Sequence, residues 1–404
     1  MKLLRVVPSM NPEYGGVCQA IRNVSPALES FGITTEILCF DASHEDFIEQ
    51  DKLDIHAIGP AKGPYGYCPG FRGWIAEHLF RFDVVIIDGL WQYHSFETIR
   101  AFLDFRKRNS TDQRIFVMPH GMLDPYFQRA KSRRLKAIRN YAFWKLIEHR
   151  VINEADGILF TCETELKLAR IPFSPYQPKM EHNVGFGIQS PPPVTAEQDA
   201  AFFEKCPEVQ GKPYWLFLGR IHPKKGVDLL VKAYLKLKEK YPELPELVIA
   251  GPGMETAYGV SLIDAKKTSE IHFPGMLKGD AKWGAFNNSE VFILPSHQEN
   301  FGIAVVEALA CGKPVLISDQ VNIFKEIVDG GGGFADQDSQ EGTFRLLKRW
   351  YTLSSPQKET MQADAAKVFR QEFTIESAAK RMVEVLYDSD PEMEKNEVIY
   401  GSIS

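Results

Sequence analysis

The stretch from Val291 to Ser318, VFILPSHQENFGIAVVEALACGKPVLIS, constrains the fold of this chain more than any other part. An apolar strand runs into a polar turn containing Glu299, a helix is predicted to begin near Gly302, and Glu307 follows on that helix. Free amides and the helix dipole make such a helix start an anion site at a strand end. Two acidic groups would repel a bare phosphate, so we expect a phosphate carrying hydroxyl-rich groups, as in a nucleotide sugar.

Short apolar runs alternate with helical patterns along both halves of the 404-residue chain. The first half contains LLRVVP, ITTEILCF, FDVVIIDGL and RIFVMPHG, and the second contains YWLFLG, ELVIAG, IHFPG, VFILPS and PVLIS. This order predicts an α/β protein with two doubly wound, Rossmann-like domains, whose strand ends face each other across a central cleft where ligands collect.

The predicted domains are 1–190 and 213–372. The proline-rich segment 191–212 is expected to be an extended linker, because proline disfavours helix and central strand. A helix over 373–390 follows the second sheet, and the polar tail 391–404 is expected to fray.

Composition excludes several classes of protein. A net charge of -6 argues against a general nucleic-acid binder. The six cysteines form no C-x-x-C pair and no zinc-binding spacing, which favours free thiols in a reducing cytoplasm. No run of residues has the length of a signal peptide or a membrane span, so we expect a cytoplasmic protein, soluble or at most peripheral on the membrane.

A cationic turn, RIHPKKG, follows the strand YWLFLG in the second half. Its position at a strand end favours phosphate binding, with Arg220 forking two oxygens and Lys225 acting as a point charge, although a plain surface turn would also fit. The turns at Gly251 and at Met276-Leu277 close neighbouring strands, where a base could meet exposed backbone groups; ordinary turn duty is the competing explanation.

The loops of the first half carry candidates of another kind. Tyr14, Gly15 and Gly16 follow the first strand, where paired glycines allow a close backbone approach or serve only the turn. His120 ends the strand RIFVMPHG, at the level of a cleft ligand. Asp88, Trp91 and Gln92 follow a further strand and offer a surface suited to a sugar-like acceptor, with loop packing as the alternative.

Metal binding has weak support in the sequence. The acidic pairs at 336/338 and 388/390 resemble diphosphate-bound metal sites, but their positions after a glycine run and in the tail favour solvated charge. Since cations and a helix start can hold a diphosphate, we expect no metal and no cofactor.

The pattern resembles the retaining nucleotide-sugar glycosyltransferases of the two-Rossmann-domain (GT-B) architecture, in the glycosyltransferase family 4 group. The motifs are E-x7-E within HQENFGIAVVEALACGKPV, LGRIHPKKGVDLLVKAY, VIAGPG and MPHGMLDP, in an order that covers nearly the whole chain. The resemblance implies a metal-independent enzyme that retains anomeric configuration, with the helix at 373–390 packing back on the first domain.

The resemblance also implies roles residue by residue. Catalytic roles fall to Glu299, Arg220, Lys225 and His120. Donor-binding roles fall to Gly15, Gly16, Gly251, Met276, Leu277, Asn300, Phe301, Gly302, Ile303 and Glu307. Acceptor binding is expected from Tyr14, Asp88, Trp91 and Gln92.

The expected reaction moves a sugar from a UDP-, GDP- or ADP-sugar to a hydroxyl of a glycan or lipid-linked glycan, in polysaccharide or surface-glycan biosynthesis. Two alternatives stay open: a nucleotide-sugar epimerase or hydrolase on the same architecture, and a non-catalytic nucleotide-sugar-binding protein. A nicotinamide dehydrogenase is disfavoured because the first strand is not followed by G-x-G-x-x-G.

The segment 129–150 carries eight Lys or Arg residues and a single carboxylate, Glu148. Its helical spacing places Leu135, Ile138 and Leu146 on one side. A basic amphipathic helix of this kind could meet an anionic membrane, on the inner face of the bilayer. The favoured interpretation is a solvated helix that packs its apolar side into the domain.

Overall fold

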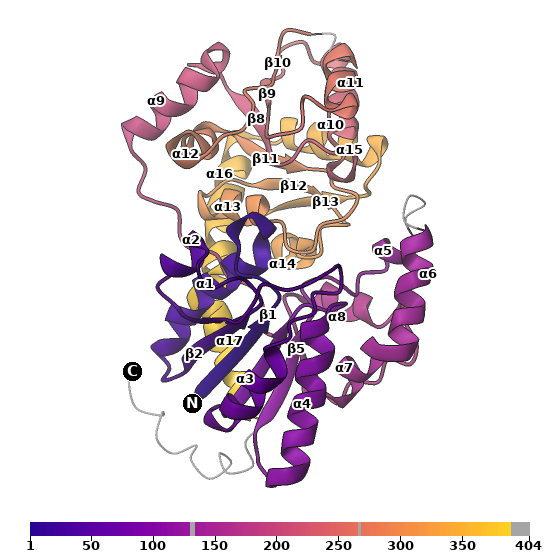
Figure 1. Cartoon of the computed structure of the whole chain (residues 1–404). Coiled ribbons are helices and arrows are strands. Elements are labelled where there is room, and N and C mark those ends of the chain that lie inside the picture. The colour runs from indigo at the N-terminus through magenta and orange to yellow at the C-terminus, as the bar shows by residue number, and fades with distance from the viewer. Residues whose placement is uncertain (130–133, 266–267, 389–404) are drawn as a thin grey trace. The chain divides into compact units, whose positions relative to one another are not determined.

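The computed structural model describes residues 1–129, 134–265 and 268–388. The chain forms two compact units: the N-terminal unit is Met1–Gly187 together with the segment that begins at Ile375, and the C-terminal unit is Ile188–Thr374. Each unit is built on one parallel sheet with helices on its faces (Figure 1). The predicted fold class of two doubly wound α/β domains is confirmed.

The N-terminal sheet has the order β3-β2-β1-β4-β5-β6-β7, and its paired strands run parallel. Its central strands are runs of Val, Ile and Leu that are buried on both faces, as helices on both sides of a sheet require. The strands are β1 (Lys2–Val7), β2 (Thr34–Cys39), β3 (Asp54–Ala57), β4 (Val84–Asp88), β5 (Arg114–Met118), β6 (Gly157–Phe160) and β7 (Glu181–Asn183).

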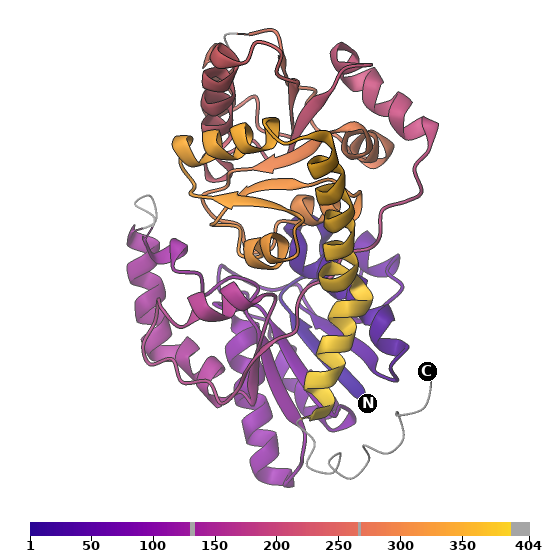
Figure 2. The ribbon, with the colours of Figure 1, turned by 180° about the vertical axis from the view of Figure 1, so that it is seen from behind.

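The helices of this unit come from both ends of the chain. They are α1 (Gly16–Glu29), α2 (Asp46–Glu49), α3 (Phe71–His78), α4 (Tyr93–Asn109), α5 (Tyr126–Arg129), α6 (Arg134–Phe143), α7 (His149–Glu154), α8 (Glu163–Ala169) and α17 (Ile375–Asp388). A π-helical segment, Trp144–Glu148, joins α6 to α7. Helix α17 lies along the N-terminal sheet, where Met382 and Leu386 share a buried cluster with Leu3 and Leu28 (Figure 2).

The C-terminal sheet has the order β10-β9-β8-β11-β12-β13, again with parallel pairs. Its strands are β8 (Tyr214–Leu218), β9 (Glu246–Ala250), β10 (Ile271–His272), β11 (Val291–Leu294), β12 (Val315–Ser318) and β13 (Gly333–Asp336). Its helices are α9 (Ala196–Lys205), α10 (Val227–Lys240), α11 (Ala257–Ala265), α12 (Gly279–Asn288), α13 (Ile303–Ala310), α14 (Phe324–Asp329), α15 (Gln340–Tyr351) and α16 (Ser355–Val368). None of the helices in the described part of the chain combines the length and apolarity needed to cross a bilayer.

The prediction of an extended linker over 191–212 is wrong, because helix α9 (Ala196–Lys205) forms within it. Thr195 and Gln198 form a capping box that satisfies amides at the helix start. Phe202 is fully buried, with its ring 5.4 Å from that of Tyr214. The prolines precede the cap, so they do not disturb the helix. The tail 391–404, which we expected to fray, lies outside the described residues.

We expect Gly284→Ala to destabilise the C-terminal unit. A Cβ at this position of α12 would lie 2.1 Å from the Gln198 backbone oxygen of α9, so the two helices must separate. The free energy of unfolding should fall by about 1–3 kcal/mol. The matched control is Gly73→Ala in α3, where a Cβ meets nothing within 4 Å and helix propensity raises stability by up to about 1 kcal/mol. Urea denaturation measures both, and equal effects would contradict the packing of α9 on α12.

Candidate functional site

Each sheet has one point where the strand order reverses. In the N-terminal unit it lies between β1 and β4, and in the C-terminal unit between β8 and β11. The chain leaves the two strands toward opposite faces of the sheet there, which opens a crevice at their carboxyl ends where ligands of such folds bind. The candidate residues are therefore described at these two reversal points.

At the C-terminal reversal point, the loop after β8 contacts the loop after β11. The Lys225 ammonium donates to the Glu299 carboxylate in an ion pair, and the two side chains are 19% and 18% exposed. The backbone N–H of His297 donates to the Lys224 oxygen at 2.8 Å, and the Ser296 hydroxyl donates to the same oxygen at 3.0 Å. The structure thus brings together a cation and an acid that the sequence placed in separate motifs.

Two glycines allow the loop after β8 to approach the segments that follow β11 and β9. Gly226 has a φ of 66°, and a Cβ there would lie 2.0 Å from the Pro295 oxygen. Gly251, at the end of β9, has a φ of 148°, and a Cβ there would lie 1.8 Å from the Gly219 oxygen. Backbone meets backbone at both contacts, so any side chain would push the loops apart.

The loop after β8 concentrates positive charge. Arg220 is exposed, and Lys224 and Lys225 follow in the 3-10 turn Pro223–Lys225. Partial loss of hydration, and then the charges of these three residues, lower the pKa of His222. A further cation is therefore disfavoured in this loop, whereas an anion would be stabilised.

Helix α13 starts beside the ion pair. Its N-cap is Gly302, with a left-handed φ of 77° that suits glycine. The backbone of Glu299 is fixed just before the helix: its N–H donates to the Gln320 oxygen, and its own oxygen accepts from the Asn322 N–H, both at 2.9 Å. The predicted helix start near Gly302 is present, and its first amides and dipole offer an anion-binding end.

The remaining donor candidates of this unit differ in exposure. Phe301 is buried with its ring 5.7 Å from Phe373, whereas Ile303 is 39% exposed. Met276 is 55% exposed and Leu277 is buried. Because the Phe301 side chain is buried, a ligand would contact this residue through its backbone.

Two further candidates are already bonded. The Asn300 side-chain oxygen accepts from Asn322 at 3.2 Å. Glu307 accepts a hydrogen bond from Lys282 of α12 at 2.7 Å. The ion pair holds the Glu307 carboxylate on the α12 side of α13.

At the N-terminal reversal point lies a cavity of about 590 Å³. Three of the four residues expected to bind an acceptor line it, namely Tyr14, Asp88 and Gln92. Trp91 is not among its lining residues. The polar lining also includes Ser9, Asn11, Asp41, Glu45 and His94, which the sequence had not singled out.

Asp88 is buried and fully engaged, rather than forming the open polar surface expected of it. Arg5 donates to its Oδ2 at 2.9 Å and to its Oδ1 at 2.5 Å, and His120 Nε2 lies 2.8 Å from Oδ1. Burial alone would raise the pKa of Asp88, but Arg5 and then His120 outweigh it and lower the pKa to about 2. Asp88 is therefore ionised, and its carboxylate positions the imidazole of His120.

The turn of His120 is held from the other side as well. His120 has a φ of 52°, and the Gly121 N–H donates to Glu165 Oε1 at 2.5 Å. The other oxygen of Glu165 accepts from the Thr161 N–H at 2.8 Å. Two buried carboxylates thus fix the end of β5, and with it the imidazole of His120.

Trp91 packs into an aromatic cluster instead of facing the cavity, which corrects its expected role as an acceptor-binding surface. Its ring centroid lies 5.2 Å from Phe173 and 6.2 Å from Trp144. Its backbone N–H donates to Glu148 Oε1 at 2.9 Å. The loop packing that the sequence left open as an alternative is what the structure shows.

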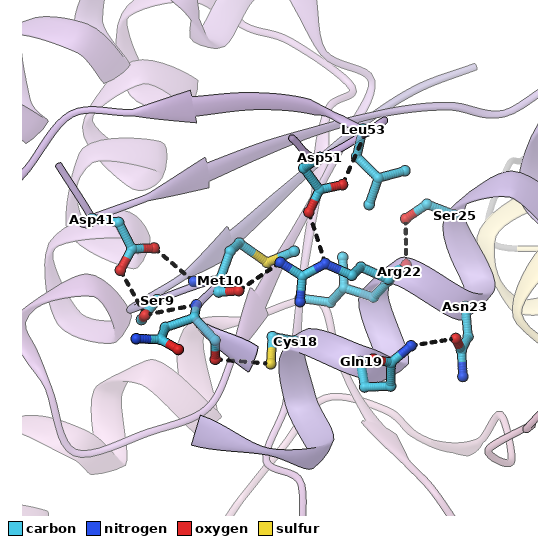
Figure 3. Close-up of polar contacts among 12 residues, drawn as sticks. Ser9, Met10, Cys18, Gln19, Arg22, Asn23, Ser25, Asp41, Asp51 and Leu53 are labelled. Carbon is cyan, nitrogen blue, oxygen red and sulfur yellow. Dashed lines mark hydrogen bonds and ion pairs between the residues drawn. The ribbon is translucent and has the colours of Figure 1, made fainter. Parts of the chain in front are cut away.

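The loop after β1 is held by the side chains of Asp41 and Arg22 (Figure 3). Asp41 accepts from the Ser9 hydroxyl at 2.6 Å and from the Met10 N–H at 2.7 Å. Arg22 donates to the Met10 oxygen at 2.6 Å and to Asp51 at 2.7 Å. This bonding fixes the loop that leads into Gly15 and Gly16 and that forms one wall of the cavity.

Gly15 and Gly16 stand at the start of α1. Gly15 has a φ of 90°, which requires glycine, whereas Gly16 does not have a positive φ. A Cβ at either position would meet nothing within 4 Å. Packing in the described structure therefore does not explain the second glycine, and the space above the pair is open to a close approach.

Both halves of the chain match known protein families. Residues 198–368 match the family described as glycosyl transferases group 1, and residues 15–175 match the glycosyl transferase 4-like domain. Together the matches cover most of both units. The chain therefore belongs to the glycosyltransferase families, with one of these two families matched in each unit.

The relatives and solved structures agree with this membership. D-inositol 3-phosphate glycosyltransferase of Streptomyces griseus is 29% identical over 182 residues, which is 42% of this chain and 38% of that protein. The aligned segment therefore spans less than half the length of this curated relative.

The fold is similar to a glycosyltransferase from Rickettsia africae, with a TM-score of 0.72 and 17% identity over 98% of this chain and 99% of that one. It is also similar to HepE of Anabaena in complex with UDP and glucose, with a TM-score of 0.68 and 14% identity over 96% and 100%. At such identities the likeness shows the fold alone, and the fold is GT-B.

The matched segments contain the candidates described above. The group 1 segment includes Lys225, Glu299 and Glu307, and the 4-like segment includes Asp88 and His120. The candidates therefore fall into two sets, one at the reversal point of each sheet.

Sequence reasoning missed the residues that support these candidates. Asp41 lies two residues after the end of β2, so the strand-end rule that selected His120 would have found it. Arg5 and Glu165 gave no signal, because a charged residue inside an apolar strand or on a short helix has no visible partner in the sequence. Their partners, Asp88 and Gly121, lie far away along the chain.

Metal-binding potential is limited among the described residues. Glu36, Asp54 and His56 bring their ligand atoms within 4.8 Å of one another, but Arg81 already donates to both oxygens of Glu36, at 2.7 and 2.8 Å. Asp336 pairs with Arg345, and Asp338 with His297, so these acids are paired rather than merely solvated as interpreted from the sequence. The acids at 388 and 390 lie outside the described side chains.

Glu148 gives this structure a pH dependence that can be measured. Its side chain is buried, and burial raises its pKa from 4.5 to about 7. Below pH 4.5 the carboxyl is protonated in both the folded and the unfolded chain. As pH rises toward 7 the unfolded chain ionises first, so the stability of the folded chain falls by up to about 3 kcal/mol.

Glu148→Gln should remove this loss, because the amide stays neutral and its oxygen can still accept from Trp91. The stability of the variant relative to the native protein is therefore expected to rise between about pH 5 and about pH 8. Urea denaturation across this range measures the difference. Parallel stability curves for the two proteins would contradict a buried, protonated Glu148.

Proposed function

We propose that this chain transfers a sugar from a UDP-, GDP- or ADP-sugar to a hydroxyl of a glycan or lipid-linked glycan. The observation that carries the proposal is the Lys225–Glu299 ion pair beside the start of α13. A diphosphate needs a cation and N–H donors, and sugar hydroxyls need a hydrogen-bond acceptor. The Lys225–Glu299 pair beside the start of α13 offers both kinds of partner. The solved complex of the similarly folded HepE with UDP and glucose supports a nucleotide-sugar donor.

The donor would be divided among the loops of the C-terminal unit. Arg220 and Lys225 would hold the diphosphate with the amides of Asn300, Phe301, Gly302 and Ile303. Glu299 would bind the sugar, Glu307 the ribose, and the backbone at Gly251, Met276 and Leu277 would border the base. Gly15, Gly16 and His120, which belong to the N-terminal unit, are proposed to contact the donor as well.

The chemistry follows from where charge develops. When the bond between the sugar and the phosphate oxygen breaks, negative charge grows on the diphosphate and positive charge on the sugar ring. Arg220 and Lys225 would supply cations for the first, and Glu299 would supply an anion for the second. We infer a metal-independent, retaining reaction by same-face attack: the acceptor oxygen bonds to the anomeric carbon while the leaving phosphate oxygen takes the hydroxyl proton.

The acceptor would enter the N-terminal cavity as an uncharged group. The described lining includes the carboxylates of Asp41, Glu45 and Asp88 and contains no Lys or Arg. Burial lowers the pKa of His94 to about 4, so this lining imidazole is neutral at pH 7. A phosphorylated acceptor would be repelled, whereas sugar hydroxyls find acceptors, which favours a glycan or the sugar end of a lipid-linked glycan.

A cytoplasmic setting in polysaccharide or surface-glycan assembly is consistent with the thiols. All six cysteines are free, and five of them are buried. Free thiols persist in a reducing compartment. Nucleotide sugars as donors and a glycan as acceptor fit biosynthesis of this kind.

We expect Lys225→Ala and Glu299→Ala each to lower kcat/KM by about 10²–10³. Loss of Lys225 leaves Glu299 uncompensated, so the carboxylate would also repel the diphosphate, and the affinity for UDP or its GDP or ADP counterpart should fall by about tenfold or more. Loss of Glu299 should spare nucleotide affinity and act on turnover. The matched control is Lys232→Ala, an exposed lysine on α10.

Product analysis with the donor alone and with acceptor mixtures separates the alternatives. Consumption of the donor without an acceptor would favour the epimerase or hydrolase. Nucleotide binding with no turnover of any kind would favour the non-catalytic binding protein. Intact turnover in both the Lys225 and Glu299 variants would contradict the assigned roles.

We expect Gln92→Ala to raise the KM for the acceptor several-fold and to leave the KM for the donor unchanged. Gln92 lines the N-terminal cavity at the start of α4, where its amide can bond a hydroxyl. The matched control is Gln19→Ala, an exposed glutamine on α1 that does not line the cavity. Steady-state kinetics with each substrate varied in turn checks this. Equal changes in both KM values would contradict an acceptor site in this cavity.

A further inference from the structure

The segment after α5 exposes a row of large apolar side chains. Leu135 is 86% exposed, Ile138 69%, Tyr141 47% and Leu146 76%. They stand on α6 and on the π-helical segment that continues it, at the periphery of the N-terminal unit (Figure 1). We call these four residues the α6 ridge. Single exposed leucines are ordinary, but several on one helical face indicate a surface that something covers.

The ridge is exposed because the segment buries its opposite side. Trp144 is fully buried, stacks on Phe173 with ring centroids 4.7 Å apart, and donates from Nε1 to the Pro175 oxygen at 3.1 Å. Glu148 is fully buried as well. The interpretation favoured from the sequence, in which the apolar side packs into the domain, is therefore wrong.

Positive charge flanks the ridge. Lys136, Arg139 and Lys145 are exposed between its members, and Lys145 Nζ lies 5.6 Å from the ring centroid of Tyr141. The only carboxylate in 134–150 is Glu148, and it is buried on the far side of the segment. Part of the basic segment predicted from the sequence, 130–133, lies outside the described residues, and the ridge does not depend on it.

We propose that the α6 ridge docks the protein on an anionic lipid bilayer. Apolar side chains surrounded by cations match an interface whose headgroups are negative and whose acyl boundary accepts Leu and Ile. A second copy of this chain fits poorly, because a two-fold contact would bring the same cations face to face. A nucleic acid would contact the cations but would leave the leucines without partners.

This inference goes beyond the proposed activity and does not rest on it. Docking through the ridge would hold the N-terminal unit at the membrane surface, where a lipid-linked acceptor is concentrated in two dimensions. A protein with no transferase activity could still dock, so the two proposals fail separately.

The test is co-sedimentation of the full chain with vesicles of phosphatidylcholine containing phosphatidylglycerol, against vesicles of phosphatidylcholine alone. The native protein should bind the anionic vesicles and release as salt rises. The variant Leu135→Gln/Ile138→Gln/Leu146→Gln should bind the anionic vesicles with an affinity that is lower by about tenfold or more. The variant Lys136→Glu/Arg139→Glu/Lys145→Glu should lose the preference for anionic lipid.

Matched controls alter exposed residues of the same kinds elsewhere. Val260→Gln/Ile263→Gln changes two half-exposed apolar residues of α11, and Lys107→Glu/Arg108→Glu changes two exposed cations of α4. Both controls should bind vesicles as the native protein does. Unchanged melting temperatures, and an unchanged thermal shift with UDP, GDP or ADP, would show that the ridge variants are folded.

Three outcomes would overturn the proposal. The first is native protein that does not sediment with anionic vesicles, or sediments equally with neutral ones. The second is vesicle binding that survives in both ridge variants. The third is sedimentation velocity showing a native dimer that the apolar ridge variant dissociates, which would make a second copy the occupant of the ridge.

Discussion

The reversal of strand order in each sheet is the constraint on which the rest of this structure depends. Because β1 and β8 each start a sheet in the middle and the chain later returns to their other side, the loop after β1 lies next to the loop after β4, and the loop after β8 lies next to the loop after β11. In the C-terminal unit this places Lys225 next to Glu299. In the N-terminal unit it opens the cavity beside Asp88 and His120. Both sets of candidate residues follow from one topological rule used twice.

Compensated charge is the second common property of the two sites. A carboxylate near a bound diphosphate is unfavourable, and Lys225 offsets the charge of Glu299 at direct contact. Asp88 would be unfavourable as a buried anion, and Arg5 and His120 offset it. In each site the acid is paired with a cation and held in a fixed position, so a functional neighbour is oriented without leaving a buried charge unpaired. Glu148 lacks such a cation, and for that reason its pKa rises instead.

Sequence alone predicted the elements better than the contacts between them. The apolar runs became strands β1, β2, β4 and β5 and β8 to β12, and a helix begins after Gly302, because local periodicity and capping determine these features. Pairs such as Arg5 with Asp88 join residues far apart in the chain, and no local pattern reveals them.

The failures have physical causes too. Prolines signalled a linker at 191–212, but the capping box at Thr195 started α9 directly after them. The stripe of Leu135, Ile138 and Leu146 had the period of a buried face, yet Trp144 on the other side offered the larger apolar surface and was buried instead. The cavity residue Asp41 could have been found, since it follows a strand end, whereas the inward rotation of Trp91 depends on the buried oxygen of Glu148.

The central claim is that the C-terminal reversal point binds the diphosphate of a nucleotide sugar. A crystal structure of the protein with UDP, or with GDP or ADP if thermal shift selects it, tests this most directly. The account predicts phosphate oxygens within hydrogen-bonding distance of Lys225 and of the first amides of α13, with Glu299 free to face the site of the sugar. A diphosphate bound away from the loops after β8 and β11 would contradict it.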